Sequence, residues 1–321
     1  MSNPPTLQKY HEEFISLFKK KTNKELANYF KCSETAVERY CKRLNLKKGH
    51  RIYELNEFFF EDIDSHEKAY VLGFLFSDGN VSKRNQIGWI IKEKDIEVLN
   101  FCKKALSYGG EIKKYKSLKE KEAVCLKVTS EKMAHDLIKL GCTKNKSLTL
   151  EWPISLEETP FIWSFLLGYL DGDGWISFRK RGYEIGMACS TPFYNGFKKF
   201  LDKQNISSYK RTHSRGTTIS IIFASKDGSV FASKILENQT FSLSRKRKKL
   251  EYIKWCYLNL TKKNGRLRNF SIGKDLFESF LISEEEFEKT ANLKRQELCN
   301  KQSARGKLSK TLFKKETNNH E

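Results

Sequence analysis

The chain has 321 residues, of which 39% are hydrophobic, so it is long enough for two or three domains with real cores. Lysine and arginine number 60 against 39 acidic residues, which gives a net charge of +21. This excess favours a polyanionic partner, with nucleic acid as the first candidate and an anionic membrane surface as the second. A peripheral membrane protein needs an amphipathic basic helix with exposed aromatic residues, and the sequence contains no convincing one.

No apolar run reaches the roughly 18 to 20 residues that cross a bilayer, and the N-terminal residues lack a signal-peptide pattern. We therefore expect an intracellular protein that is not secreted, in the cytoplasm, the nucleoid or an organelle. The eight cysteines include no C-x-x-C pair, which argues against a zinc ribbon or a disulfide framework.

Residues 1–51 are predicted to form a small all-α helix-turn-helix module. Apolar residues at helical spacing predict a helix over 7–20, and Thr22 with Glu25 forms a capping-box pattern that starts a second helix. Ser33 starts a third helix, whose outward face carries candidate DNA-binding side chains, namely Thr35, Arg39, Lys42 and Arg43. The alternative is a three-helix bundle with a solvated charged face.

The rest of the chain is predicted to contain one unit twice. Residues 52–64 are expected to be a linker, and residues 65–153 and 154–262 both follow the order α-β-β-α-β-β-α. Composition alone does not produce a repeated element order, so we predict an α+β fold with two pseudo-symmetric domains. Residues 263–321 are expected to form a basic C-terminal tail that is partly helical.

Each predicted domain begins with an apolar helix that contains small residues and ends in aspartate. Residues 71–79 read VLGFLFSDG and residues 166–174 read LLGYLDGDG. Gly73 and Gly168 are predicted to form the interface between the two helices, because small residues on one helix face allow close backbone approach. We expect the first helix to run from Ser65 to Gly79, with a strand over 81–83, and the second helix to run over 161–170.

If these helices pack side by side, Asp78 and Asp173 meet at two negative helix ends. The two carboxylates would repel each other unless a cation lay between them, and oxygen-liganded Mg²⁺ suits such a place. Asp171 is expected to point away from the paired face. The alternative is a buried apolar helix with a glycine-rich stop, which the second copy of the pattern makes less favourable.

The two motifs resemble those of the LAGLIDADG homing endonucleases, in the single-chain form with two domains, over about residues 60 to 260. The second copy is a close match, whereas the first has Phe76 where the family often has aspartate. The resemblance implies Mg²⁺- or Mn²⁺-dependent hydrolysis of both DNA strands at a long asymmetric target, and it associates the chain with intron-encoded mobile elements. The implied metal ligands are Asp78, Asp173 and the backbone carbonyls of Ser77 and Gly172.

In the family, a lysine after the last helix of each domain often lies near the cleavage centre. Lys146 and Lys246 are the candidates here. The basic run over 245–249 has the alternative interpretation of a solvated helix start.

The resemblance also implies that two antiparallel sheets lie in the DNA major groove. The candidate strand and turn residues are Lys83, Arg84, Gln86, Lys114, Lys116, Arg179, Arg181, Lys210, Arg211, His213 and Arg215. For each of them, a phosphate contact or plain solvation is the alternative to base recognition.

The leading functional prediction is a site-specific double-strand DNA endonuclease that works as a monomer, because both motif helices are on one chain. The alternative is a non-cleaving nucleic-acid-binding protein on the same scaffold, either a splicing cofactor that binds intron RNA or a transcription regulator. The presence of both aspartates favours the enzyme, because a binding protein does not need them.

Overall fold

The chain divides into two compact units, Met1–Glu54 and Leu55–Glu321. The computed structural model describes residues 7–18, 21–46, 53–116, 122–143, 146, 149–179, 182–212, 219–260, 274–283, 285–287, 289–294, 296 and 300. Within these ranges, no helix has both the length and the apolar character needed to cross a bilayer.

The first unit is a bundle of short helices. Its elements are η1 (Leu7–Tyr10), α1 (His11–Phe18), α2 (Asn23–Tyr29) and α3 (Glu34–Arg43). Both predicted N-caps are confirmed, because Thr22 and Glu25 exchange the two hydrogen bonds of a capping box and Ser33 Oγ accepts from the Ala36 amide. The three helices enclose a small core around Phe14. DNA recognition by α3 stays a prediction.

The second unit contains the predicted element order twice. The first copy comprises α4 (His66–Ser77), β1 (Gly79–Val81), β2 (Gln86–Lys92), η2 (Glu93–Asp95), α5 (Ile96–Ala105), β3 (Lys113–Lys116), β4 (Glu122–Thr129) and α6 (Glu131–Lys139). The second copy comprises η3 (Ile154–Leu156), α7 (Ile162–Asp173), β5 (Gly174–Arg179), β6 (Gly182–Cys189), α8 (Thr191–Lys203), β7 (Tyr209–Thr212), β8 (Ile219–Ala224) and α9 (Ser225–Leu236). The helices α10 (Ser244–Leu260) and α11 (Lys274–Ile282) follow.

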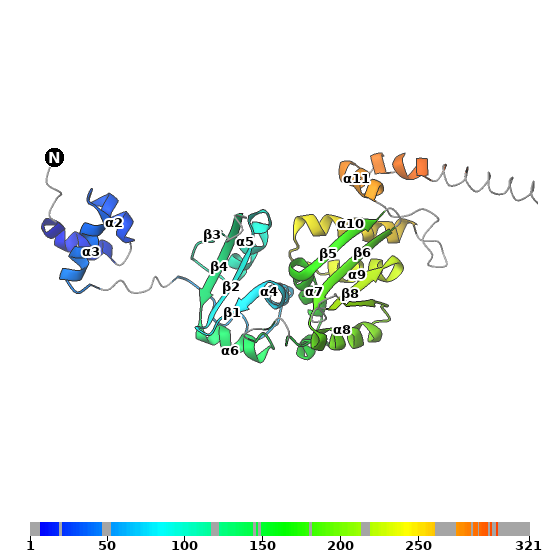
Figure 1. Ribbon diagram of the computed structural model, residues 1–321, viewed down its shortest axis with the longest axis horizontal. Helices are drawn as coiled ribbons and strands as arrows, with labels where there is room; N and C mark the ends of the chain where they lie inside the picture. Colours follow the sequence, from blue (N-terminus) through cyan, green and yellow to red (C-terminus); the bar gives the residue numbers. More distant parts are fainter. Residues whose placement is uncertain are drawn as a thin grey trace, which may run out of the picture. The chain divides into compact units, whose positions relative to one another are not determined.

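Each copy forms one antiparallel sheet of four strands, in the orders β1-β2-β4-β3 and β5-β6-β8-β7. The predicted α+β class and the repeat are therefore confirmed. The helices α4 and α7 lie side by side between the two sheets (Figure 1).

Glycine allows α4 and α7 to approach until their backbones touch. A Cβ atom added at Gly73 would lie 1.9 Å from the carbonyl oxygen of Phe165, and one at Gly168 would lie 2.1 Å from that of Tyr70. No side chain fits at either position, so both glycines lie where the two helices are in contact.

Three boundaries differ from the prediction. The helix α7 runs on to Asp173 rather than ending at 170, because Gly172 stays helical where its missing Cβ makes room for Ser77 Oγ. The strand β1 begins at Gly79, two residues early, because α4 passes directly into it. Part of the expected linker 52–64 belongs to the second unit, since Phe59 and Phe60 are buried in its core.

Replacing Gly168 with valine should destabilise the second unit by about 1 to 3 kcal/mol or more, because the new side chain would displace the α4 backbone. Urea unfolding followed by tryptophan fluorescence measures this change, since all five tryptophans lie in residues 55–321. Lys104→Ala, at an exposed position of α5, is the control and should change stability by less than about 0.5 kcal/mol. An unchanged midpoint for Gly168→Val would contradict the backbone contact.

Candidate active site

The two aspartates lie where α4 and α7 end. Asp78 is the C-cap residue of α4, and Asp173 is the last residue of α7. The helix ends touch, because a Cβ atom added at Gly172 would lie 3.2 Å from the backbone nitrogen of Asp78. Both aspartates are exposed, so a large substrate can reach them.

Two buried lysines cap these helix ends. Lys146 Nζ donates to the carbonyl oxygens of Phe76 (2.5 Å) and Ser77 (2.6 Å) at the end of α4. Lys246 Nζ donates to three carbonyl oxygens at the end of α7, those of Leu170 (2.6 Å), Asp171 (2.8 Å) and Gly174 (2.7 Å). Each lysine thus offsets the negative end of the motif helix of its own half.

The charges of the four residues interact. The protein packed around the carboxylates raises the pKa of Asp78 and that of Asp173, although both residues are exposed. The pKa of Asp173 rises to about 6, through this desolvation first and the negative charge of Asp78 second. The ammonium groups of Lys146 and Lys246 oppose both increases. Burial lowers the pKa of both lysines, that of Lys246 to about 8.

A recess opens beside this group. Its lining brings together residues from both halves, which are Phe76, Ser77, Lys146, Leu150, Tyr169, Asp173, Ala188, Cys189 and Ser190. Asp173 and Lys146 line the recess, and the charges of Asp78 and Lys246 act on Asp173, so the structure brings these four predicted residues close together.

The expected orientation of Asp171 was wrong. Its side chain is buried between the two halves, where Oδ2 accepts hydrogen bonds from Tyr70 Oη (2.6 Å) and from the Leu243 amide (2.8 Å). Burial raises the pKa of Asp171 to about 6. Asp171 lies two positions before Asp173, which is about 200° around α7, so its side chain turns toward α4 and away from the exposed site.

The side chains of each sheet alternate between a core face and an open face, which is turned away from the apolar core. In the first sheet, Lys83 and Arg84 are exposed in the β1–β2 turn, and Gln86 begins β2. The register of β3 pairs Lys113 with Cys125 and Lys114 with Val124.

Val124 belongs to the core, so Lys114 lies on the core side of the edge strand, where it forms an ion pair with Glu93 (3.1 Å). The register therefore favours Lys113 over the predicted Lys114 as an open-face residue.

The open face of the second sheet carries an ordered polar group around Glu184. This buried carboxylate accepts from Arg211 Nη1 (2.8 Å) and Nη2 (3.0 Å), and also from Trp175 and Tyr209. Arg211 is thus on the expected face but is held in a fork by an acid. Lys210 lies over the ring of Tyr194 in α8 (5.2 Å), on the core side.

Sequence reasoning missed Glu184, although an acid in the apolar strand over 182–189 was a detectable signal. The other predicted DNA contacts fall in two groups. Exposed on α3 of the first unit are Thr35, Arg39, Lys42 and Arg43. Outside the described residues lie Arg181, His213 and Arg215, together with the side chains of Lys116 and Arg179.

Asp78→Asn should lower the pKa of Asp173 from about 6 toward its ordinary value, because it removes a neighbouring negative charge. Lys146→Met should raise that pKa further, because it removes a positive charge. Titration of side-chain carboxyl carbons by ¹³C NMR measures both shifts, with Lys104→Gln as a charge-matched control away from the site. If the pKa of Asp173 were unchanged in Asp78→Asn, the two carboxylates would not share a site.

Comparisons with known proteins identify the second copy of the repeat. Residues 160–236, which span α7 to α9, match the family model of the LAGLIDADG-like domain. No match was found among curated proteins.

Three similar solved structures are described as homing endonucleases on DNA. I-WcaI bound to its DNA recognition sequence has 13% identity and a TM-score of 0.44, covering 66% of this chain and 92% of that chain. I-LtrWI bound to target DNA has 11% identity and a TM-score of 0.41, covering 75% and 98%. I-SmaMI bound to cleaved DNA has 12% identity and a TM-score of 0.41, covering 64% and 89%. The match to the LAGLIDADG-like domain is therefore limited to residues 160–236, and residues 66–139 repeat the element order of that region.

Proposed function

We propose that this protein is a site-specific DNA endonuclease that requires a divalent metal ion, Mg²⁺ or Mn²⁺, and makes a double-strand break at a long asymmetric target. The observation that carries the proposal is the pair of exposed aspartates at touching helix ends, each end capped by a buried lysine. An exposed carboxylate at a negative helix end is unfavourable, and a fold that keeps two of them together has a use for a cation there.

The residues present fit a hard divalent ion. Asp78 and Asp173 would hold it with the carbonyl oxygens of Ser77 and Gly172, which gives the all-oxygen donor set that Mg²⁺ prefers. Ser77 O already accepts from Lys146 Nζ, so it would use its second lone pair. Among the described residues, no group of three or more His, Cys, Asp or Glu side chains is placed so that it could hold a metal ion. Water and DNA phosphates would therefore supply the remaining ligands.

A bound divalent ion supplies an activated water and neutralises charge on the phosphate. The chain's own contribution is electrostatic and geometric. Lys146 and Lys246 would place positive charge beside scissile phosphates bound at the two aspartates, where negative charge develops during cleavage. One motif helix from each half would serve one strand, so a monomer has both half-sites.

Binding would rest on the open faces of the sheets and on the first unit. The net charge of +21 supports a polyanionic partner. On the second sheet, Glu184 orients Arg211, and a fixed guanidinium is better suited to base recognition than a mobile one. The exposed basic face of α3 would add phosphate contacts from the first unit.

Asp78→Asn and Asp173→Asn should each reduce double-strand cleavage by at least about 100-fold, because each removes a charge from the metal ligands. Binding should stay largely intact, since it depends on many dispersed lysines and arginines. Asp171→Asn is the matched control and should keep cutting, because its amide oxygen can still accept from Tyr70 and Leu243.

The measurement is a cleavage screen on DNA that flanks the insertion point of the gene, with and without Mg²⁺, and a gel shift on the same DNA. Loss of cleavage in Asp171→Asn with normal cleavage in Asp173→Asn would overturn the site assignment. A wild-type protein that binds DNA or intron RNA tightly but cuts no target would be a binding protein instead.

Deleting residues 1–51 should weaken target binding and make its salt dependence shallower, by about 1 in slope for each lost phosphate contact. The double variant Arg39→Gln/Arg43→Gln should reproduce part of this loss. The control Lys9→Gln/Lys24→Gln removes the same charge from exposed positions outside α3 and should have a smaller effect. Fluorescence anisotropy at several salt concentrations measures both, and equal losses in the two double variants would argue against recognition by α3.

A further inference from the structure

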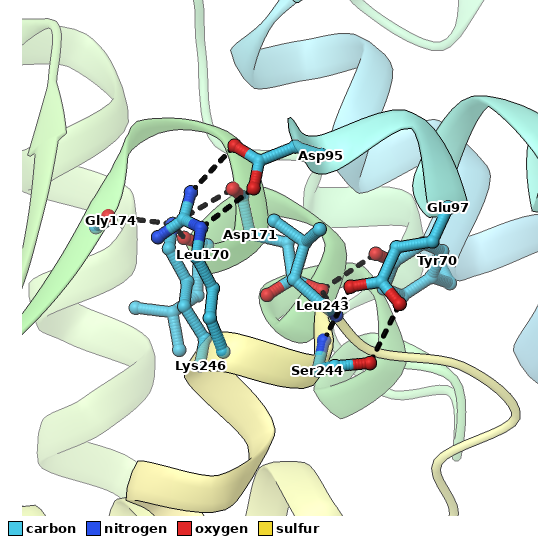
Figure 2. A network of polar contacts seen from close by, with 10 residues as sticks. Tyr70, Asp95, Glu97, Leu170, Asp171, Gly174, Leu243, Ser244 and Lys246 are labelled. Carbon is cyan, nitrogen blue, oxygen red and sulfur yellow. Dashed lines mark hydrogen bonds and ion pairs between the residues drawn. The ribbon is translucent and has the colours of Figure 1, made fainter. Parts of the chain in front are cut away.

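We infer that Asp95 and Glu97 of the first half are positioning residues for Lys246 of the second half, so that the two lysines of the site are held by different means. The position of Lys246 does not depend on the proposed function; only the expected effect on DNA cleavage rests on that function. We use the name α10 clamp for the contacts of residues 243–245 with Asp171, Glu97 and Asp95 (Figure 2).

The α10 clamp fixes three consecutive residues at the start of α10. The amide of Leu243 donates to Asp171 Oδ2 (2.8 Å). Ser244 donates twice to Glu97, from its amide (2.7 Å) and from its hydroxyl (2.6 Å).

Arg245 completes the clamp with a two-pronged ion pair. Its Nε and Nη2 donate to the two carboxylate oxygens of Asp95, at 2.7 and 2.9 Å. The carboxylate of Asp95 is 13% exposed and the guanidinium of Arg245 47%, so solvent screens this pair only in part.

Glu97 also acts as an acidic cap. Its carboxylate binds the first residue of α10, where the helix dipole favours negative charge. This cap comes from the other half of the protein, so the start of α10 depends on α5 being in place. Phe241, just before α10, also stacks on Phe101 of α5, with 4.5 Å between the ring centroids, which adds a second contact between these two segments.

Lys246 is the next residue after the clamp. It is 3% exposed and donates to three backbone carbonyls at the end of α7. The contacts of residues 243–245 fix the backbone at the start of α10. Lys246 is the third residue of this helix, so the clamp determines where its ammonium group lies.

The segment that carries Lys146 is anchored in a different way. Leu150 O accepts from Ser190 Oγ, and Trp152 stacks on Phe197 of α8 (5.0 Å). In the described part of 141–153 no ion pair fixes Lys146 from the other half. Ion pairs and carboxylate contacts at the adjoining residues therefore hold Lys246, whereas a serine hydrogen bond and the packing of Trp152, whose indole donates to Glu157 (2.9 Å), hold the segment of Lys146.

The first test needs no DNA. Competitive acetylation of the full-length protein, with mass spectrometry of each lysine, compares Asp95→Asn and Arg245→Gln with wild type. We expect Lys246 to react roughly two- to five-fold faster in both variants, with Lys146 unchanged. Glu93→Gln on η2 and Arg247→Gln on α10 each break a neighbouring ion pair with the same charge change and should leave both lysines unchanged. An unchanged Lys246, or an equal increase at both lysines, would overturn the inference.

The second test uses supercoiled plasmid DNA that carries the target, to detect nicking, and a linear fragment with the same target labelled separately on each strand. Loosening the α10 clamp should slow cleavage of one DNA strand more than cleavage of the other. Nicked DNA should therefore accumulate with Asp95→Asn and Arg245→Gln, but not with Glu93→Gln or Arg247→Gln. The exchange Asp95→Arg/Arg245→Asp should restore paired cutting in part. Equal slowing of both strands would overturn the inference, whereas an inactive wild type would refute the proposed function and leave the acetylation result to decide on the clamp.

Discussion

Backbone atoms of α4 and α7 touch because each helix presents glycine at the crossing. This contact brings the C-terminal ends of both helices to one place, and therefore brings together two negative dipole ends and two aspartates. Everything at the site follows from that proximity. Larger residues at Gly73 or Gly168 would separate the helices, and the carboxylates would then act as two independent surface groups.

Where the helices end together, their negative dipole ends and the two aspartates repel one another, and two lysines of the same chain offset this repulsion. Lys146 and Lys246 lie beneath the surface and donate to the last carbonyls of the two helices, while Asp78 and Asp173 stay exposed above them. Burial lowers the pKa of Lys246 to about 8, so this lysine keeps its charge at neutral pH and begins to lose it in mildly basic solution. The negative charge at the surface is thus balanced in part from below and remains available to a ligand from above.

Patterns among neighbouring residues predicted the features of this structure that are determined within one helix or strand. Capping residues, alternation and the spacing of small residues indicated the helix starts, the two sheets and the two aspartates of the site. The two lysines were implied only by the resemblance to a known family. Contacts between distant segments were not predictable in this way. Asp171 depends on Leu243, which is far along the chain, and no periodicity in α7 indicates that partner.

The faces of Lys114 and Lys210 depend on strand register, and a shift of one residue exchanges the two faces of a strand. Glu184 had a signal in the sequence, an acid within an apolar strand. Its meaning depends on Arg211 in a strand that is not adjacent to it in the sheet.

The segments that follow each copy of the repeat pack against the other half, and so join the two halves into one folding unit. Trp152, which follows the first copy, fills the space above Gly196 in α8, and Phe241, which follows the second copy, stacks on Phe101 of α5. Each half therefore supplies side chains that complete the core of the other. A chain divided between the copies would expose both aromatic surfaces. We therefore expect the two halves to unfold together as one cooperative unit, and neither half to fold stably alone.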